Sequence, residues 1–234
     1  MNLTALIKKE LKHLFYSPVA YVVSGIFLLI TGWFFTNALF LTGEAELRGM
    51  MDIMPLLLMF FMPAITMRLV AEERKVDTLQ LLLTMPVRDW EVVFSKYIAA
   101  LVLYLGILSV TLIYVIVVSL LGEPDGGVIF SQYLGLVLLG ATFIGIGLFS
   151  STITSSQVVA FIVGFSIVFV FFIGSKLQMV LPLWVQAVVE RFSMVSRFER
   201  ILRGVMGLDD LVYFVTVNLF FIMLSTYVLK RRRG

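Results

Sequence analysis

The sequence predicts an all-α membrane protein with six transmembrane helices, and three observations support this fold class. Hydrophobic residues make up 60% of the chain, and its mean hydropathy is +1.03. Only 14% of the residues are charged, whereas a soluble domain carries roughly 25%. Long uncharged runs alternate with short polar segments, which is the pattern of a polytopic membrane protein. We expect residues 1–234 to form a single transmembrane domain.

The opening segment 1–17 is predicted to form an amphipathic helix that lies along the membrane interface. Its apolar residues recur at helical spacing and are Leu3, Leu6, Ile7, Leu11, Leu14 and Phe15. The opposite side of this helix is expected to carry Lys8, Lys9, Glu10, Lys12 and His13. Pro18 should then separate the helix from the uncharged run that follows.

Six runs are apolar and long enough to cross a bilayer. At about 1.5 Å per residue, the first run reaches about 35 Å, which exceeds a hydrocarbon core of about 30 Å. The predicted spans are 19–41, 51–70, 92 or 97 to 121, 128–149, 157–173 and 211–229. Pro55 and Pro63 are expected to kink or locally unwind the second span. In the fourth span, Ala141 and Gly145 form a small-xxx-small pair that allows close helix approach.

The connections after the third span differ in character. GEPDGG at 122–127 predicts a turn, and the uncharged SSTITSS at 150–156 predicts a tight connection. Residues 175–210 depart from this hairpin pattern, because apolar residues at helical spacing are followed by a charged cluster at 190–203. We expect one or two helices there that lie in, or re-enter, the external interface before the sixth span.

The distribution of basic residues predicts the topology. Twelve Lys and Arg residues and six acids fall on the side that holds the amphipathic helix, the loop after the second span and the tail. The other side holds six bases and nine acids. The positive-inside rule therefore predicts a multi-pass protein of the inner (plasma) membrane with both termini in the cytoplasm. Because the basic residues lie at segment ends, they indicate membrane topology and lipid contact rather than nucleic-acid binding.

Few side chains in this sequence could perform chemistry. The chain has no cysteine and a single histidine, His13, which is expected to be solvated. It has no Gly-Lys pair, so a P-loop for ATP is excluded, and the only acid within the predicted spans is Asp52, near one end. We therefore expect no catalytic residue, metal site or cofactor in this chain. A separate subunit would have to supply the energy.

The segment AEERKVDTLQLLLTMPVRDWEVVFSK, residues 71–96, is the longest polar interruption of the chain. Residues 78–85 could form a short helix that Pro86 would end, with one apolar face made by Leu79, Leu82 and Leu83. Such a face exposed to the cytosol is best explained by a docking partner. A solvated loop that only joins two spans is the alternative.

At these residues the chain resembles the type-2 ABC transporter permeases. Their signature has an acid-basic pair, then Gly-Thr, a leucine cluster, a proline and a lysine. The matching positions here are Glu73 with Arg74, Asp77 with Thr78, Leu81 to Leu83, Pro86 and Lys96. Asp77 departs from the usual glycine, which affects the turn before the short helix. KKELKHLFYSPVAYVVSGIFLL and MPAITMRLVAEER look closer still to the gliding-motility-associated subgroup.

The resemblance implies a permease whose cytosolic loop 71–91 rests on an ABC ATP-binding subunit, where ATP and Mg would bind. The implied coupling surface consists of Glu72, Glu73, Arg74, Asp77, Thr78, Leu79, Leu82 and Leu83. The resemblance also implies a second permease copy, as a homodimer, and leaves room for a large extracytoplasmic accessory protein. The cargo and the direction of its movement are not implied.

Three functions are compatible with these observations. The first is an ATP-driven permease that exports or moves a cargo. The second is a scaffold that carries no cargo and transmits the motion of an ATPase to an extracytoplasmic partner. The third, a membrane-embedded enzyme, is disfavoured by the scarcity of titratable residues in the spans.

Overall fold

A computed structural model describes residues 3–42, 46–76, 87–177 and 193–231, and these residues form helices without strands. The helices are α1 (Leu3–Phe15), α2 (Pro18–Thr42), α3 (Arg48–Thr66), α4 (Ala71–Lys75), α6 (Asp89–Val110), α7 (Leu112–Leu121), α8 (Gly126–Ile153), α9 (Gln157–Leu177), α11 (Met194–Leu202) and α12 (Leu208–Arg231). The predicted all-α class is confirmed for this part of the chain.

Six helical segments are long and apolar enough to cross a membrane, as predicted. They are Pro18–Phe40, Arg48–Lys75, Asp89–Leu121, Gly126–Ile153, Gln157–Gly174 and Leu208–Arg231. Large apolar side chains on their outer faces are exposed, for example Leu29, Ile116, Val170 and Met223. Apolar exposure of this extent would be unfavourable in water and suits contact with lipid or with another membrane helix.

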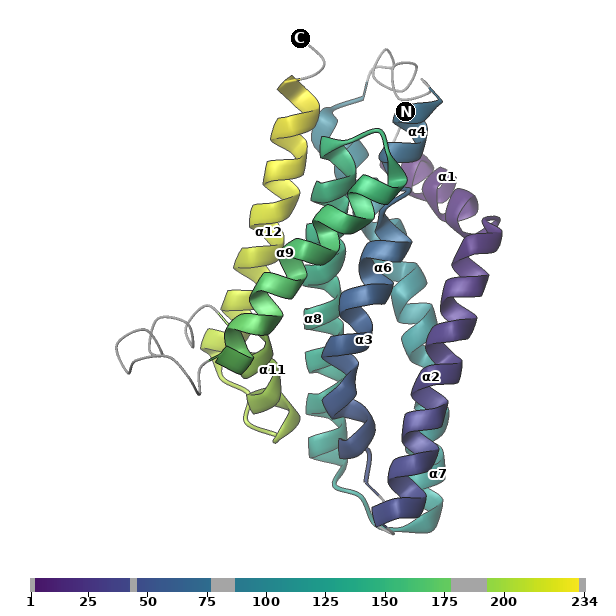
Figure 1. Cartoon of the computed structure of the whole chain (residues 1–234), viewed down its shortest axis with the longest axis vertical. Helices are drawn as coiled ribbons and strands as arrows, with labels where there is room; N and C mark the ends of the chain where they lie inside the picture. The colour runs from purple at the N-terminus through teal and green to yellow at the C-terminus, as the bar shows by residue number, and fades with distance from the viewer. Residues whose placement is uncertain (1–2, 43–45, 77–86, 178–192, 232–234) are drawn as a thin grey trace.

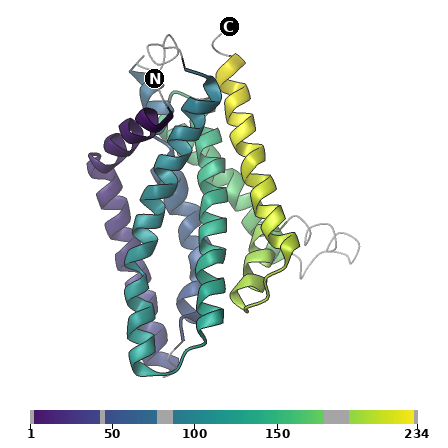
Figure 2. The same ribbon diagram turned by 180° about the vertical axis from the view of Figure 1, so that it is seen from behind.

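Helix α8 is the centre of the bundle. It packs along α12, α9 and α3 and also contacts α11 and α6 (Figures 1 and 2). Glycines on α8 allow this close packing: a Cβ atom on Gly140 would lie 2.3 Å from the ring of Tyr104, and one on Gly147 would lie 1.9 Å from the Thr66 hydroxyl. The sequence therefore permits close helix approach at these positions because the glycines have no side chain.

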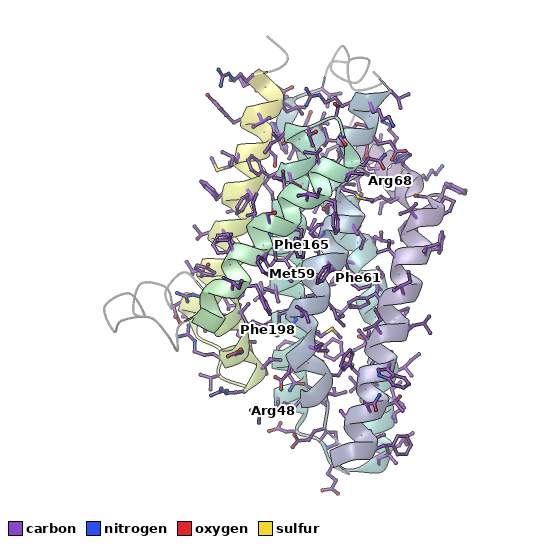
Figure 3. All side chains as sticks on the ribbon, in the orientation of Figure 1. Arg48, Met59, Phe61, Arg68, Phe165 and Phe198 are labelled. Atoms are coloured by element: carbon purple, nitrogen blue, oxygen red, sulfur yellow. The ribbon has the colours of Figure 1, made fainter. Side chains whose placement is uncertain are left out.

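Helix α3 is the second internal helix and has aromatic contacts on two sides. Phe61 meets Phe27 of α2 edge to face, with ring centroids 5.2 Å apart. Phe60 meets Phe165 of α9 at 4.8 Å, so α3 lies between α2 and α9 (Figure 3). The buried methionines of α3 are Met50, Met51, Met54, Met59 and Met62. Their unbranched side chains can repack when neighbouring helices shift.

Helix boundaries differ from the predictions at two places. The second span remains helical through Pro55 and Pro63, so the local unwinding expected there does not occur, and the helix ends at Thr66 rather than at the predicted residue 70. Helix α8 continues to Ile153, so part of the predicted connection 150–156 is helical. Ser150 and Thr152 donate hydrogen bonds to carbonyl oxygens of their own helix, which explains how a polar run can extend it.

Helix α11 lies within the segment 175–210, where one or two helices were expected. Residues 178–192 lie outside the described part, so the first of the two helices is not tested. Arg197 Nη1 lies 2.9 Å from Asp210 Oδ1, and Arg200 also pairs with Asp210, whose side chain is buried. These ion pairs hold α11 against the start of α12. The location of α11 at an external interface remains a prediction.

Candidate functional site

The residues that precede the predicted coupling helix lie where α1, α4, α6 and the ends of α8 and α9 meet. The amphipathic helix α1, the short helix α4 and the C-terminal end of α12 all lie at this end of the bundle (Figure 1). After Thr66 the chain turns through 67–70 and then forms the single turn of helix in α4. Residues 67–70 lead from α3 into α4, whose side chains reach other helices.

Hydrogen bonds fasten the start and the middle of α4 to α8. The backbone N–H groups of Val70 and Ala71 both donate to Ser151 Oγ at 3.0 Å, and the Ser151 hydroxyl donates to the Met67 carbonyl at 3.0 Å. Arg74 Nη1 donates to the Ile153 carbonyl at 3.1 Å. One serine thus satisfies three backbone groups of the turn, so α4 is fixed to the last turn of α8.

Four charged residues form what we call the buried ion cluster: Lys9 and Glu10 of α1, Glu73 of α4 and Lys96 of α6. Lys96 Nζ lies 3.0 Å from Glu10 Oε2 and 2.8 Å from Glu73 Oε2. Lys9 Nζ lies 3.6 Å from one oxygen of each carboxylate. The Lys96 side chain is only 1% exposed and that of Glu10 only 2%, whereas Lys9 is 50% exposed. Two bases balance two acids, so the cluster carries no net formal charge.

The position of Glu10 corrects a prediction from the sequence. Glu10 was expected on the solvated side of the first helix with the lysines. Instead Leu6, Glu10 and Leu14 share the buried face of α1, which packs against α6. Buried carboxylates require a positive partner, and Lys96 supplies it from the buried face of α6. The spacing of Leu6, Glu10 and Leu14, four residues apart, was the available signal.

A second polar contact set is built around Arg68, in the turn between α3 and α4. Its Nη1 donates to Ser17 Oγ at 3.2 Å, and its Nε donates to Gln157 Oε1 at 3.3 Å. Nε also lies 3.3 Å from Glu72 Oε2. Arg68 thereby joins the α1–α2 corner, the start of α9 and α4, where the sequence alone predicted only that it would reach an interface.

Breaking the buried ion cluster would leave an uncompensated charge in a poorly solvated place. Removal of one partner from a buried ion pair typically destabilises a protein by about 3–5 kcal/mol. The exposed Lys9 contact contributes less, because surface pairs are worth about 0–1 kcal/mol. The cluster therefore favours arrangements in which α1, α4 and α6 stay together, and separate movement of α4 is unfavourable.

Comparison with known proteins identifies the family. The family model described as ABC-2 family transporter protein matches residues 4–232. The chain belongs to this family. A search of curated proteins gave no match. Membership of the ABC-2 family makes the chain a multi-pass membrane protein and a permease component of an ABC transporter. The family also implies an ABC ATP-binding subunit as partner. Such permeases are generally not catalytic themselves.

The predicted coupling residues of this permease fall into two groups. Glu72, Glu73 and Arg74 lie on α4, and each reaches a different partner: Arg68, Lys96 and the Ile153 carbonyl. The other predicted residues lie outside the described part of the chain and are Asp77, Thr78, Leu79, Leu82 and Leu83. The structure thus places Glu73 of the signature against the bundle and does not test the docking face.

Two residues of this site were missed by sequence reasoning. Ser151 was assigned to a connection, because a hydroxyl near the end of a span gives no sign of the backbone it will bind. Lys9 was assigned to a solvated face, although it reaches both carboxylates of the cluster. Lys96 was recognised only as a signature position, and its partner Glu10 lies 86 residues away in the chain.

Proposed function

We propose that this permease converts ATP hydrolysis by a separate ATP-binding subunit into export or movement of a cargo, with the buried ion cluster as the connection. The observation that carries the proposal is the ion pairing of Glu73 with Lys96, directly before the predicted docking segment 77–86. A displacement of residues 77–86 by the ATP-binding subunit would be transmitted first to α4. Because α4 is bonded to α8 and paired with α6 and α1, the helix ends would move as one unit.

The proposed docking surface comprises Glu72, Glu73, Arg74, Asp77, Thr78, Leu79, Leu82 and Leu83. In this proposal the leucines bind the ATP-binding subunit, and the charged residues connect the docking segment to the spans. ATP and Mg bind only in the partner subunit. A second copy of the permease completes a homodimer, and the assignment to the gliding-motility-associated subgroup rests on the resemblance of residues 8–29 and 62–74 to that subgroup.

The proposed orientation puts α1, α4 and both termini in the cytoplasm and the protein in the inner (plasma) membrane. It rests on the excess of lysine and arginine at this end, in agreement with the positive-inside rule. In this orientation α1 lies in the inner interface and α11 in the outer one. An ATP-binding subunit would then meet α4 from the cytosol.

A scaffold that transmits motion to an extracytoplasmic protein is the second candidate. It is favoured by interior polar groups that bind other helices. Asn218 Nδ2 donates to the Tyr97 hydroxyl at 2.5 Å, and Tyr104 donates to the Leu136 carbonyl at 2.8 Å. Such contacts hold helices together, so a route for cargo would have to lie between two chains. Co-purification of an extracytoplasmic protein with the permease would favour the scaffold over the cargo permease.

The docking segment is tested by Leu79→Asp with Leu82→Asp in a tagged permease. Charges on the apolar face should release the ATP-binding subunit, because burial of an unpaired carboxylate is unfavourable. The measurement is co-purification in mild detergent followed by mass spectrometry. Lys75→Asp, at an exposed position of α4, is the matched control and should retain the subunit. Full retention of the ATPase by the double variant would refute this docking face.

The connection is tested separately with the triple variant Glu10→Met, Glu73→Met and Lys96→Met, which puts apolar side chains of similar volume in place of the buried charges. Replacing every buried charge is often close to neutral for stability, unlike removal of one partner. The triple variant keeps the docking leucines and should therefore still bind the ATPase, while the effect of the permease on its ATP turnover is lost. Unchanged ATP turnover in the reconstituted complex would rule out the buried ion cluster as the connection.

A further inference from the structure

A pocket of about 440 Å³ lies between the last turns of α8 and α12. The residues that line it are Phe149, Ile153, Tyr227, Val228 and Arg231. Helix α12 runs along α8 to this end of the bundle (Figures 1 and 2), and the ring centroids of Phe149 and Phe221 lie 5.8 Å apart between the two helices. The pocket therefore combines an apolar wall, built by two helices, with one guanidinium group.

The positive charge at this pocket has no internal partner. Arg231 and its neighbour Lys230 are both exposed, and with the other described residues neither forms an ion pair or a side-chain hydrogen bond. No acid is among the described residues that line the pocket. Guanidinium groups bind phosphate oxygens through paired N–H donors. The pocket therefore suits an anionic group such as a phosphate.

Two pockets at the opposite end of the bundle also contain arginines but differ in charge. Arg48 and Arg203 line both of them. The acids that share this lining are Glu46, Asp52, Glu123, Asp125 and Glu199. Because these five carboxylates outnumber the two guanidinium groups, an anion is disfavoured there. The pocket at Arg231 is thus distinguished by unbalanced positive charge, not by the presence of arginine alone.

The position of the pocket along α12 indicates where its occupant comes from. Helix α12 has 24 residues, so its length of about 36 Å exceeds a hydrocarbon core of about 30 Å. Arg231 is its last residue, which puts the guanidinium where hydrocarbon gives way to lipid headgroups. Tyr227, one turn earlier, is 63% exposed, and tyrosine rings favour this level of a bilayer. An occupant therefore has access from the lipid phase.

We propose that this pocket binds an anionic phospholipid. The phosphate lies at Arg231, Lys230 adds a second positive charge, and the start of an acyl chain lies against Phe149 and Val228. The headgroup carries no ammonium group, because the described lining has no carboxylate to pair with one. Water-soluble glycerol phosphate shares the anionic chemistry, but it would leave the apolar wall uncovered. The site depends neither on a cargo nor on ATP or the ATP-binding subunit.

A lipid in this pocket would touch the helix end that holds α4. Ile153 lines the pocket with its side chain, and its carbonyl accepts the hydrogen bond from Arg74 of α4 at 3.1 Å. Binding would therefore restrict the last turn of α8 and, through it, the attachment of α4.

The test titrates the purified, delipidated full chain with phosphatidylglycerol, with phosphatidylcholine of equal acyl composition, or with glycerol phosphate, and follows its Tm. Phosphatidylglycerol should raise Tm by about 5 °C or more at about 100 times its Kd. Phosphatidylcholine should raise it clearly less, because its choline cation is repelled by Lys230 and Arg231. Equal shifts for the two lipids would overturn the proposed charge selectivity. A shift with glycerol phosphate as large as that with phosphatidylglycerol would overturn the role of the acyl chain.

Charge variants locate the site. Lys230→Gln with Arg231→Gln should abolish most of the preference for phosphatidylglycerol over phosphatidylcholine, because the phosphate loses both positive partners. Arg48→Gln with Arg203→Gln is the matched control, since it removes two exposed arginines at the opposite end, and it should keep the preference. A full response in the first variant would refute the assigned site. An equal loss in both would show that the lipid responds to the net charge of the chain instead.

A further pair of variants tests the pocket without removing Arg231. In Tyr227→Glu the new carboxylate lies four residues before Arg231, where it would pair with the guanidinium and repel a phosphate. This variant should therefore lose most of the shift caused by phosphatidylglycerol. Tyr227→Gln has a side chain of the same length without the charge and should keep more of it; the exposed position makes both changes compatible with folding. Equal shifts in the two variants would overturn the placement of the phosphate at Arg231.

Discussion

Lys96 of α6 and the two arginines Arg48 and Arg203, which lie at opposite ends of the bundle, differ in their surroundings. At the junction of α1, α4 and α6, Lys96 is almost fully buried and lies within 3.0 Å of carboxylates from two other helices. At the far end, the exposed Arg48 and Arg203 line open pockets and form no ion pair with the described residues. At the far end Arg197 and Arg200 also pair internally, with the buried Asp210, whereas Arg48 and Arg203 face accessible space.

This difference shows how a largely apolar chain can combine a fixed region with an adaptable one. Buried pairs restrict the relative positions of their helices, because separation exposes unpaired charge to a poorly polar environment. Arg48 and Arg203 have no charged partner within the described part of the chain and impose no such restriction. Helices α3 and α8 contribute residues near both ends of the bundle.

The largest expected effect comes from Lys96→Met, which removes the central base of the buried ion cluster. Glu10 and Glu73 would then be left with only the exposed Lys9, so we expect a loss of about 3–5 kcal/mol in the free energy of unfolding. The measurement is thermal or denaturant-induced unfolding of the purified permease in one detergent.

Lys75→Met is the matched control for this prediction. Lys75 is exposed on α4, so the same change of side chain should alter stability by less than about 0.5 kcal/mol. If both variants lost equal stability, the contrast between buried and exposed charge would not explain the junction.

An intermediate effect is expected from Gly140→Ala, which acts between the two ends. The new Cβ atom would lie 2.3 Å from the ring of Tyr104, so α6 and α8 would have to move apart or Tyr104 would have to change position. Insertion of a methyl group into a packed interior typically costs about 1–3 kcal/mol. We expect a lower Tm and loss of the hydrogen bond from Tyr104 to Leu136.

Gly106→Ala is the matched control, since a Cβ atom there would meet no atom within 4 Å. In a helix, alanine is favoured over glycine by about 1 kcal/mol, so this variant should be neutral or more stable. A loss of stability in both variants would mean that the glycines matter for backbone freedom rather than for helix contact.

The spans were predictable because hydropathy is a local property of the chain. The uncharged runs gave six candidate membrane helices, and the ABC-2 family was recognised from residues around Glu73 and Lys96. The end of α8 was misplaced because serine and threonine can satisfy their hydroxyl groups on their own helix, as Ser150 and Thr152 do.

The ion pairs of Lys96 with Glu10 and Glu73, where α1, α4 and α6 meet, could not be predicted from local hydropathy. Apolar periodicity put Glu10 on the solvated side of α1, and only the partner Lys96, distant in sequence, makes burial of this acid tolerable. The hydrogen bonds of Ser151 to Val70, Ala71 and Met67 were also not predictable, because they depend on how α8 packs against the turn before α4. The four-residue spacing of Leu6, Glu10 and Leu14 indicated the buried face of α1, but the partners of Glu10 and Ser151 depend on tertiary packing, which the local pattern does not encode.

The smallest effect is expected from Lys9→Gln, which removes the exposed base of the buried ion cluster. Lys9 Nζ lies 3.6 Å from both carboxylates, but its side chain is half exposed and water competes for the charge. We expect a loss of less than about 1 kcal/mol at low salt, and high salt should reduce it further. Unfolding curves of Lys9→Gln and Lys96→Met at two salt concentrations test this. A salt-independent loss as large as that of Lys96→Met would show that Lys9 is part of the buried core and that the cluster needs both bases.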